Sequence, residues 1–453
     1  MLSLIAPIGS LLSGVALLLL GNGLLNTLLT LRGVAEGYST GMLGLIMSGY
    51  FVGFLLGTWL AIPLVRRVGH IRAFAFFAAL AAITALLHIL WVDPWFWLGL
   101  RVLYGLAMVS LYMVIESWLN AQVPDGKRGK VFALYMVVNL GALAAAQQLL
   151  QLDSPETFSL FVLAAILISA ALMPITLTRK IQPSMPETLH SNLRQLIGVA
   201  PLAMAAAALS GLALGGFWAM TPVYANLLGF DAAGVGLLMT SAILGGALLQ
   251  WPIGHFSDKY DRRKVLLWVV VLAILVSLLI SLLPAGPLLL GMIFVWGGLV
   301  FAIYPIAFAQ MIDQLHSDEI LAGSSGLLMI NGIGSVFGPL LAGLLMQQFG
   351  TQALPLYFAA ALGLLGAYTV FRLRHVSDLV SEPLGHFVPM LRTSHAVLEL
   401  MPETSSAEHP APTDEEEVAG EESIKAEPKQ PEETDQVELE AEEPQPLHRH
   451  SRI

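Results

Sequence analysis

The chain repeats itself at a single offset of 192 residues, and the repeated stretches are apolar and as long as membrane helices. Without any gap, residues 38–44 align with residues 230–236. The identities at this offset are Trp59 with Trp251, Gly99 with Gly291, Gly105 with Gly297, Tyr112 with Tyr304 and Asn139 with Asn331. Two membrane halves related by a parallel repeat place a substrate site at their interface, near the middle of the bilayer. The repeat therefore predicts a transporter.

The composition is that of a membrane protein. Hydrophobic residues make up 56% of the chain and the mean hydropathy is +0.74, well above the values of soluble chains. A helix needs about 20 apolar residues to cross the hydrocarbon core. The stretches of this kind are 6–30, 40–64, 70–92, 95–122, 128–152, 156–178, 198–226, 231–256, 264–283, 286–314, 320–347 and 353–373. They predict an all-α integral membrane protein with twelve transmembrane helices in two six-helix pseudo-symmetric bundles.

Charge is distributed unequally along the chain. Residues 1–375 carry 17 Lys and Arg against 13 Asp and Glu, whereas residues 376–453 carry 5 against 19. The basic residues gather in loops on one side of the predicted spans, and only Arg32 falls on the other side. Because basic loops stay in the cytoplasm, both termini should be cytoplasmic.

The predicted halves are an N-terminal bundle at 1–178 and a C-terminal bundle at 198–375. Residues 179–197 contain two prolines and no apolar run, so we predict a cytoplasmic linker between the bundles. Residues 376–453 form an acidic segment that is rich in Glu and Pro. Such a composition buries too little apolar surface to offset the entropy of ordering, which predicts a mostly disordered cytoplasmic tail.

A charged loop joins the eighth predicted span to the ninth. It resembles the loop signature of the major facilitator superfamily, and the matching residues are Gly254, Asp258, Lys259, Arg262 and Arg263. Asp261 stands where the family usually has Gly. Carboxylates and guanidinium groups at helix ends can make charge-assisted hydrogen bonds that hold neighbouring helices together.

The corresponding loop in the first half is less similar to the signature. Arg67, Gly69 and Arg72 fit it, while Ile62 and Arg66 depart from it. This loop is either a weakened version of the charge network or a plain basic loop that sets membrane topology.

A second resemblance is carried by an arginine inside the fourth predicted span. The run 98–105 resembles the fourth-helix motif of the superfamily, with Leu98, Arg101 and Gly105 in the motif positions. The resemblance implies a role for Arg101 in proton-coupled transport. An Arg at the centre of a span costs about 2.5–3.5 kcal/mol, so it usually faces a cavity or a partner. The alternative is that Arg101 lies near the helix end and extends to the membrane surface.

The eleventh predicted span contains the run Gly334-Ser335-Val336-Phe337-Gly338-Pro339. It resembles a Gly-Pro motif that antiporters of the superfamily carry on the fifth helix. Its place on the eleventh helix weakens an antiporter assignment. Small residues allow close helix contact, and Pro339 frees a carbonyl. We therefore expect Gly334, Gly338 and Pro339 to pack and bend this helix.

Four further runs resemble a bacterial branch of uncharacterised transporters of the superfamily, related to YcaD. The runs are 25–28, 116–117, 250–254 and 338–339. The resemblance covers residues 1–375 and implies the fold of the superfamily and secondary transport, without naming a substrate. It also implies a multi-pass protein of the bacterial inner membrane that works as a monomer in the lipid bilayer.

Carboxylates in or near the spans are the candidates for proton coupling or gating. They are Glu116, Asp258 and Asp313. Glu116 is 15 residues from Arg101, roughly 22 Å along a helix at about 1.5 Å per residue, so the two cannot pair. Glu116 is either a proton carrier or a cytoplasmic gate partner of Arg66, Arg67 or Arg128, and the gate is slightly favoured.

Polar and aromatic side chains in the spans are candidates for the substrate cavity. By position on the helices that line the site in the superfamily, we select Asn26, Tyr112, Asn139, Trp218, Tyr304 and Asn331. The alternative for each is a role in helix packing, because buried amides often bridge helices. The two repeat-related pairs, Tyr112 with Tyr304 and Asn139 with Asn331, could face one cavity from both halves.

Several function classes are excluded or disfavoured. The absence of cysteine removes thiol chemistry and cysteine-based metal sites, and no phosphate-binding Gly-Lys-Ser/Thr loop or hydrolase motif occurs. We expect no metal, no cofactor, no enzymatic activity and no nucleic-acid partner. The leading hypothesis is a secondary transporter that works by alternating access on a small, neutral or weakly charged solute. Proton coupling is left open, and efflux is slightly favoured over uptake. The alternatives are a membrane sensor or scaffold whose acidic tail recruits a partner, and a membrane enzyme.

Overall fold

The computed structural model describes residues 2–122, 127–176, 193–316 and 319–375, with side chains from Ile8 onward and without that of Leu321. All of the described residues belong to one compact unit. The predicted tail at 376–453 and the linker residues 179–192 lie outside the described residues. The remaining linker residues, 193–197, belong to a short helix.

The described chain is helical and contains no strand. The helices of the first half are α1 (Leu2–Ala35), α2 (Thr40–Val68), α3 (His70–Leu90), α4 (Pro94–Gln122), α5 (Arg128–Gln148), the 3-10 helix η1 (Leu149–Leu152), α6 (Ser159–Ala170) and α7 (Leu172–Thr176). Those of the second half are α8 (Leu193–Val199), α9 (Pro201–Leu227), α10 (Ala232–Lys259), α11 (Arg262–Ile280), α12 (Pro287–Ile312), α13 (Ile320–Phe349) and α14 (Ala353–His375).

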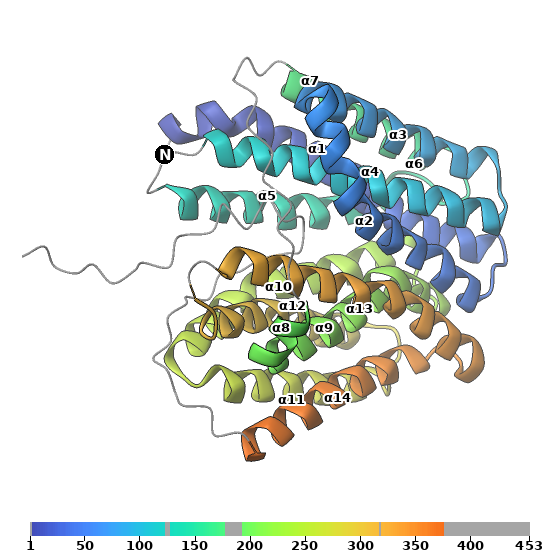
Figure 1. The fold of residues 1–453 in the computed structure, drawn as a ribbon. Helices are drawn as coiled ribbons and strands as arrows, with labels where there is room; N and C mark the ends of the chain where they lie inside the picture. The colour runs from blue at the N-terminus through green and yellow to red at the C-terminus, as the bar shows by residue number, and fades with distance from the viewer. Residues whose placement is uncertain (1, 123–126, 177–192, 317–318, 376–453) are drawn as a thin grey trace, which may run out of the picture. The chain divides into compact units, whose positions relative to one another are not determined.

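Twelve of the described helical stretches are long and apolar enough to cross a membrane. This confirms the predicted twelve spans, with η1 extending α5 and α7 continuing α6. The first span continues to Ala35, five residues beyond its predicted end. Within this compact unit, Figure 1 shows the first-half helices, coloured from blue at α1 to green at α7, grouped against the second-half helices, coloured green to orange.

The repeat is visible in how equivalent helices begin. Ser39 accepts a hydrogen bond from the Met42 amide at the start of α2. Its repeat partner Asp231 accepts one from the Gly234 amide at the start of α10. These side chains satisfy amides that have no partner within the helix. The glycines two residues earlier, Gly37 and Gly229, both have a left-handed backbone, with φ of 76° and 92°, which glycine adopts without steric cost.

Repeat-related glycines also set the helix crossings within each half. A Cβ atom on Gly105 of α4 would collide with the backbone carbonyl of Tyr50 on α2. A Cβ on Gly297 of α12 would collide in the same way with Ala242 on α10, and Ala242 is the repeat partner of Tyr50. Small residues at these crossings let the backbones approach closely.

The contact between the halves is symmetric in the same way. Helix α2 packs against α13, and the repeat-related α10 packs against α5. The Ser48 hydroxyl donates to the Val336 carbonyl at 2.7 Å. Its repeat partner Thr240 donates to the carbonyl of Ala144 at 3.2 Å, and Ala144 is the partner of Val336. One offset therefore relates both contact surfaces, as expected for a pseudo-two-fold arrangement of two halves.

Candidate functional site

A cavity of about 150 Å³ lies between the halves. The first half contributes Leu19, Asn22, Gly23, Asn26, Thr27, Met47, Tyr50, Phe51, Phe54, Arg101, Tyr112, Asn139, Leu143 and Gln147. The second half contributes Leu214, Gly215, Trp218, Ala219, Asn331 and Ser335. The wall thus comes from α1, α2, α4 and α5 on one side and from α9 and α13 on the other.

Every second-half residue on the wall has its repeat partner on the wall as well. The pairs are Asn22 with Leu214, Gly23 with Gly215, Asn26 with Trp218, Thr27 with Ala219, Asn139 with Asn331 and Leu143 with Ser335. Helices α1 and α9, and likewise α5 and α13, therefore present equivalent faces to one central space. The positions are equivalent but most of the side chains are not.

Arg101 is a buried cation in this wall. Its side chain comes from α4 and is 1% exposed. Its Nη2 donates to the Oδ1 of Asn26 on α1 at 2.6 Å. Its guanidinium carbon lies 4.7 Å from the ring centroid of Tyr50 and 5.5 Å from that of Tyr104, within cation–π range. The structure thus places Arg101 inside the bundle rather than at the membrane surface.

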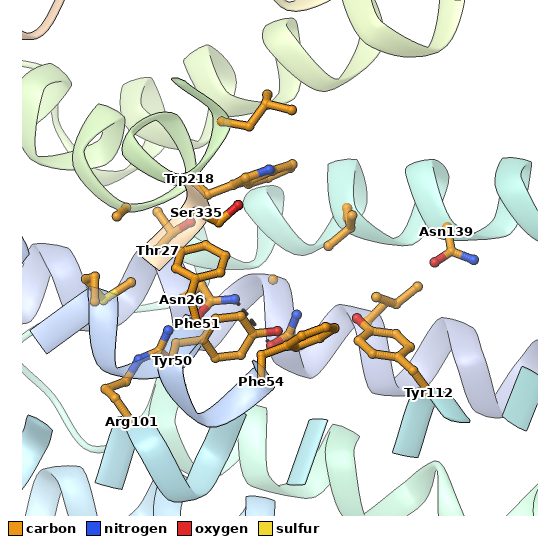
Figure 2. Close-up of a pocket in the computed structure, with 18 of the residues that line it drawn as sticks. Asn26, Thr27, Tyr50, Phe51, Phe54, Arg101, Tyr112, Asn139, Trp218 and Ser335 are labelled. Carbon is orange, nitrogen blue, oxygen red and sulfur yellow. Dashed lines mark hydrogen bonds between the residues drawn. The ribbon is translucent and has the colours of Figure 1, made fainter. Parts of the chain in front are cut away.

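Aromatic side chains cover much of the cavity. Tyr50 and Phe51 pack edge to face with ring centroids 5.2 Å apart. The ring centroids of Phe54 and Tyr112 are 6.3 Å apart. Figure 2 shows Arg101, Asn26 and Tyr50 at one end of the cavity and Tyr112 and Asn139 at the other. Trp218 and Ser335 approach from the second half. The cavity can therefore hold a solute with both polar and apolar parts.

Amides on the wall serve different structural purposes. The Thr27 hydroxyl donates to Gln147 Oε1 at 2.7 Å, which ties α1 to α5. Asn331 donates to the Ala207 carbonyl at 2.9 Å and so ties α13 to α9. Asn139 instead donates to the Tyr135 carbonyl of its own helix at 2.7 Å. Asn331 therefore both packs α13 against α9 and lies on the cavity wall.

Glu116 lies next to the cavity but is not among the wall residues. It is fully buried on α4, one helical turn beyond the wall residue Tyr112. The Tyr135 hydroxyl on α5 donates to its Oε1 at 2.5 Å. Tyr135 in turn lies one turn before the wall residue Asn139. Glu116 and Tyr135 therefore link α4 to α5 just past one end of the cavity.

The second-half charged loop forms an ion-pair cluster away from the cavity. Arg262 is 5% exposed at the start of α11. Its Nε lies 2.8 Å from Asp313 Oδ2 at the end of α12, and its Nη2 lies 3.4 Å from Asp258 Oδ1 on α10. Three helix ends are therefore joined through one guanidinium. Gly254 is buried in α10 and Lys259 is its exposed last residue.

Asp261, which departs from the family signature, has a clear local role. Its carboxylate accepts a hydrogen bond from the Arg263 amide at 3.0 Å and thereby begins α11. It also forms an ion pair with the Arg263 guanidinium at 3.2 Å. A carboxylate at a helix start is favoured by the helix dipole. Asp261 therefore caps α11, at a position where the family usually has a flexible Gly.

The first-half loop has a different chemistry at the same positions. Gly69 has a φ of 85° and separates α2 from α3. The repeat partner of Arg262 is His70, which stacks on Trp118 with ring centroids 5.9 Å apart. Arg67 and Arg72 are exposed. An aromatic stack thus occupies the position where the second half has the buried guanidinium.

The Gly-Pro run packs α13 against its neighbours. A Cβ on Gly334 would collide with the Ala208 carbonyl of α9, and one on Gly338 with the Leu212 carbonyl of α9. Pro339 lies inside the uninterrupted α13 and contacts Gly44 of α2. These residues therefore lie where the second half meets both its own α9 and the first half.

The structure brings together five of the six cavity candidates on one wall, namely Asn26, Tyr112, Asn139, Trp218 and Asn331. Tyr304 is buried on α12 at 5% exposure and is not among the wall residues. Sequence analysis did not select Tyr50, Phe51 and Phe54. Aromatic residues on an apolar helix resemble lipid-facing ones, and the sequence carries no separate signal for which side of α2 faces inward.

The chain is similar to known proteins both in sequence and in structure. The sequence model described as Major Facilitator Superfamily matches residues 11–320 and 203–400. The "Uncharacterized MFS-type transporter YcaD" of Escherichia fergusonii is 28% identical over 386 residues, which cover 84% of this chain and 98% of that protein.

Two solved structures share the fold. The nucleoside transporter NupG has a TM-score of 0.68 at 16% identity and aligns over 81% of this chain and 99% of its own. A bacterial homologue of the human lysosomal transporter Spinster, in an inward-facing and occupied conformation, has a TM-score of 0.66 at 14% identity. It aligns over 82% of this chain and 96% of its own. With the family match and the repeated fold in agreement, the chain belongs to the Major Facilitator Superfamily.

Proposed function

We propose that this secondary transporter moves a small solute through the central cavity by alternating access. The observation that carries the proposal is the cavity wall, on which every second-half residue has its repeat partner as well. Two equivalent faces around one space allow each half to turn about the solute. We propose residues 1–178 and 198–375 as the two moving halves.

The contacts between the halves supply one gate. Thr40 at the start of α2 donates to the Gly343 carbonyl near the end of α13 at 3.0 Å. Gln148 at the end of α5 donates to Thr240 near the start of α10 at 2.6 Å. The basic loops lie at the opposite ends of α2 and α10. By the distribution of basic residues, we propose that the gate faces away from the cytoplasm of a bacterial cell and that the Arg262 cluster faces the cytoplasm.

Glu116 is the group we propose for proton coupling, if transport uses a proton gradient. Of the three carboxylates considered, Asp258 and Asp313 contact the Arg262 guanidinium at a helix end. Glu116 is instead buried beside the cavity and accepts a hydrogen bond from Tyr135. Its pairing with Arg66, Arg67 or Arg128 as a gate stays a prediction. The aromatic and amide wall supports export of amphipathic compounds over uptake of strongly polar nutrients.

The proposal is tested with purified protein in liposomes under an imposed proton gradient. A compound library is screened for solute flux while the internal pH is recorded. We expect at least one solute to move, with proton movement that Glu116→Gln abolishes and that Tyr135→Phe slows. Specific binding without flux would favour a sensor and contradict transport. Flux with unchanged proton movement in Glu116→Gln would instead assign Glu116 to the gate.

A further inference from the structure

The cavity carries a net positive charge. Arg101 is the one charged residue among the described residues of the wall, which has no Asp, Glu, Lys or His. The first neighbour of its guanidinium is an uncharged amide, that of Asn26. Tyr50 and Tyr104 cover the guanidinium through their ring faces. The wall thus holds a cation without a protein carboxylate beside it.

The hydrogen-bonding capacity of Arg101 is also only partly used. Its Nη2 reaches Asn26, whereas Nε and Nη1 have no hydrogen-bond partner among the residues that the structure describes. The side chain is 1% exposed. A buried cation with unsatisfied donors is costly unless an anion or another acceptor completes it. The cavity next to it is where such an acceptor can enter.

The chemistry of the guanidinium narrows the acceptor. Its planar donors match the two oxygens of a carboxylate, and this pairing is short and charge-assisted. The rest of the wall nearby is aromatic, with Tyr50, Phe51, Phe54 and Trp218. A cavity of about 150 Å³ equals in size the roughly 150 Å³ engineered cavity that binds benzene. One ring or a short branched chain therefore fits beside the charge.

We propose that the transported solute is a small organic monoanion. Its carboxylate pairs with Arg101, and its apolar or aromatic body lies against Tyr50, Phe51, Phe54 and Trp218. This inference rests on the proposed function, because it takes the central cavity as the transport site. It sharpens the expectation of a neutral or weakly charged solute by assigning the sign of the charge.

The test uses pairs of probes that share one carbon skeleton and differ in the head group, which is a charged carboxylate in one and a neutral amide in the other. Calorimetry on the purified full-length protein at neutral pH compares benzoate with benzamide, and 4-methylpentanoate with 4-methylpentanamide. We expect the carboxylate of at least one pair to bind about tenfold or more tightly than its amide, as for a desolvated charge pair. Arg101→Gln should remove this preference, and Arg101→Lys should keep part of it, because a point charge remains without the planar donors.

Arg374→Gln serves as the control, because Arg374 is an exposed cation at the end of α14. It should leave the preference unchanged. Equal binding of the amide and the carboxylate, a preference that persists in Arg101→Gln, or failure of both carboxylates to bind the folded protein would overturn the inference. Flux measurements separate it from the proposed function. Carboxylates that bind without being moved contradict transport alone, whereas flux restricted to neutral or cationic solutes contradicts the anion assignment alone.

Discussion

The two halves meet around one cavity with matching backbones and different side chains. Asn26 and Trp218 occupy equivalent positions on α1 and α9, yet one holds a guanidinium and the other presents an indole. The first half adds α2 and α4 to the wall, and with them Arg101 and most of the aromatic rings. The second half contributes one aromatic ring, two polar side chains and three small or aliphatic residues. The two halves thus share a scaffold, while most of the polar and aromatic side chains of the wall come from the first half.

The loops show the opposite distribution. In the second half Arg262 joins Asp258 and Asp313, whereas in the first half the equivalent His70 stacks on Trp118. The two halves therefore differ in where their polar side chains interact. The first half carries most of the polar side chains of the cavity wall, and the second half carries the ion pairs that join helix ends.

The largest effect is expected from substitutions at the repeat-related helix crossings, which should destabilise both halves equally. Gly105→Val and Gly297→Val each force a side chain against a neighbouring backbone carbonyl, and overpacking costs about 1–3 kcal/mol or more. We expect both variants to lose most of the folded protein in size-exclusion chromatography. Gly99→Val and Gly291→Val are the matched controls, because a Cβ at either site meets nothing within 4 Å. Normal folding of only one of the two crossing variants would refute the symmetric scaffold.

A smaller effect should separate the two loops. Arg262→Ala leaves Asp258 and Asp313 without the guanidinium that joins them. We expect the free energy of unfolding to fall by about 2 kcal/mol. This is below the usual cost of breaking a buried pair, because both carboxylates are partly exposed. His70→Ala removes a stacked ring and should cost about 1 kcal/mol. Thermal melting in detergent would show the larger decrease for Arg262→Ala. Equal decreases would mean that the two loops stabilise the protein to the same extent.

The smallest effect concerns the hydroxyl groups between the halves. Ser48→Ala and Thr240→Val each remove one hydrogen bond to a carbonyl of the other half, worth about 0.5–1.5 kcal/mol. Thr240→Val should cost more, because Thr240 also accepts from Gln148. Both variants should shift the protein away from the conformation with this gate closed, as measured by cross-linking rates of cysteines placed on α2 and α13. Faster cross-linking in either variant, which would mean that the gate opens less readily, would count against the gate.

Much of the fold could be predicted from the sequence, because apolar length and one repeat offset determine spans and their grouping. Asn139 and Asn331 could be paired because the repeat relates them without any knowledge of packing. The Arg101–Asn26 contact could not be predicted, since it depends on the rotation of α4 about α1. The same holds for the ion pair of Asp313 with Arg262, since it depends on how α11 and α12 pack, and the sequence alone indicates Asp313 only as a candidate for proton coupling or gating. The repeat does not predict that Tyr304 lies off the wall while its partner Tyr112 lies on it, because α12 does not contribute to this wall although α4 does.

Alternating access about the pseudo-two-fold cavity is most directly tested by electron–electron distance measurements. The chain has no cysteine, so spin labels can be placed at repeat-related exposed positions on each end. One pair is Ala35→Cys with Leu227→Cys, and the other is Arg72→Cys with Lys264→Cys. In lipid nanodiscs at acidic and alkaline pH, and with benzoate, we predict that one distance lengthens while the other shortens. Two distances that stay fixed, or that change in the same direction, would contradict alternating access.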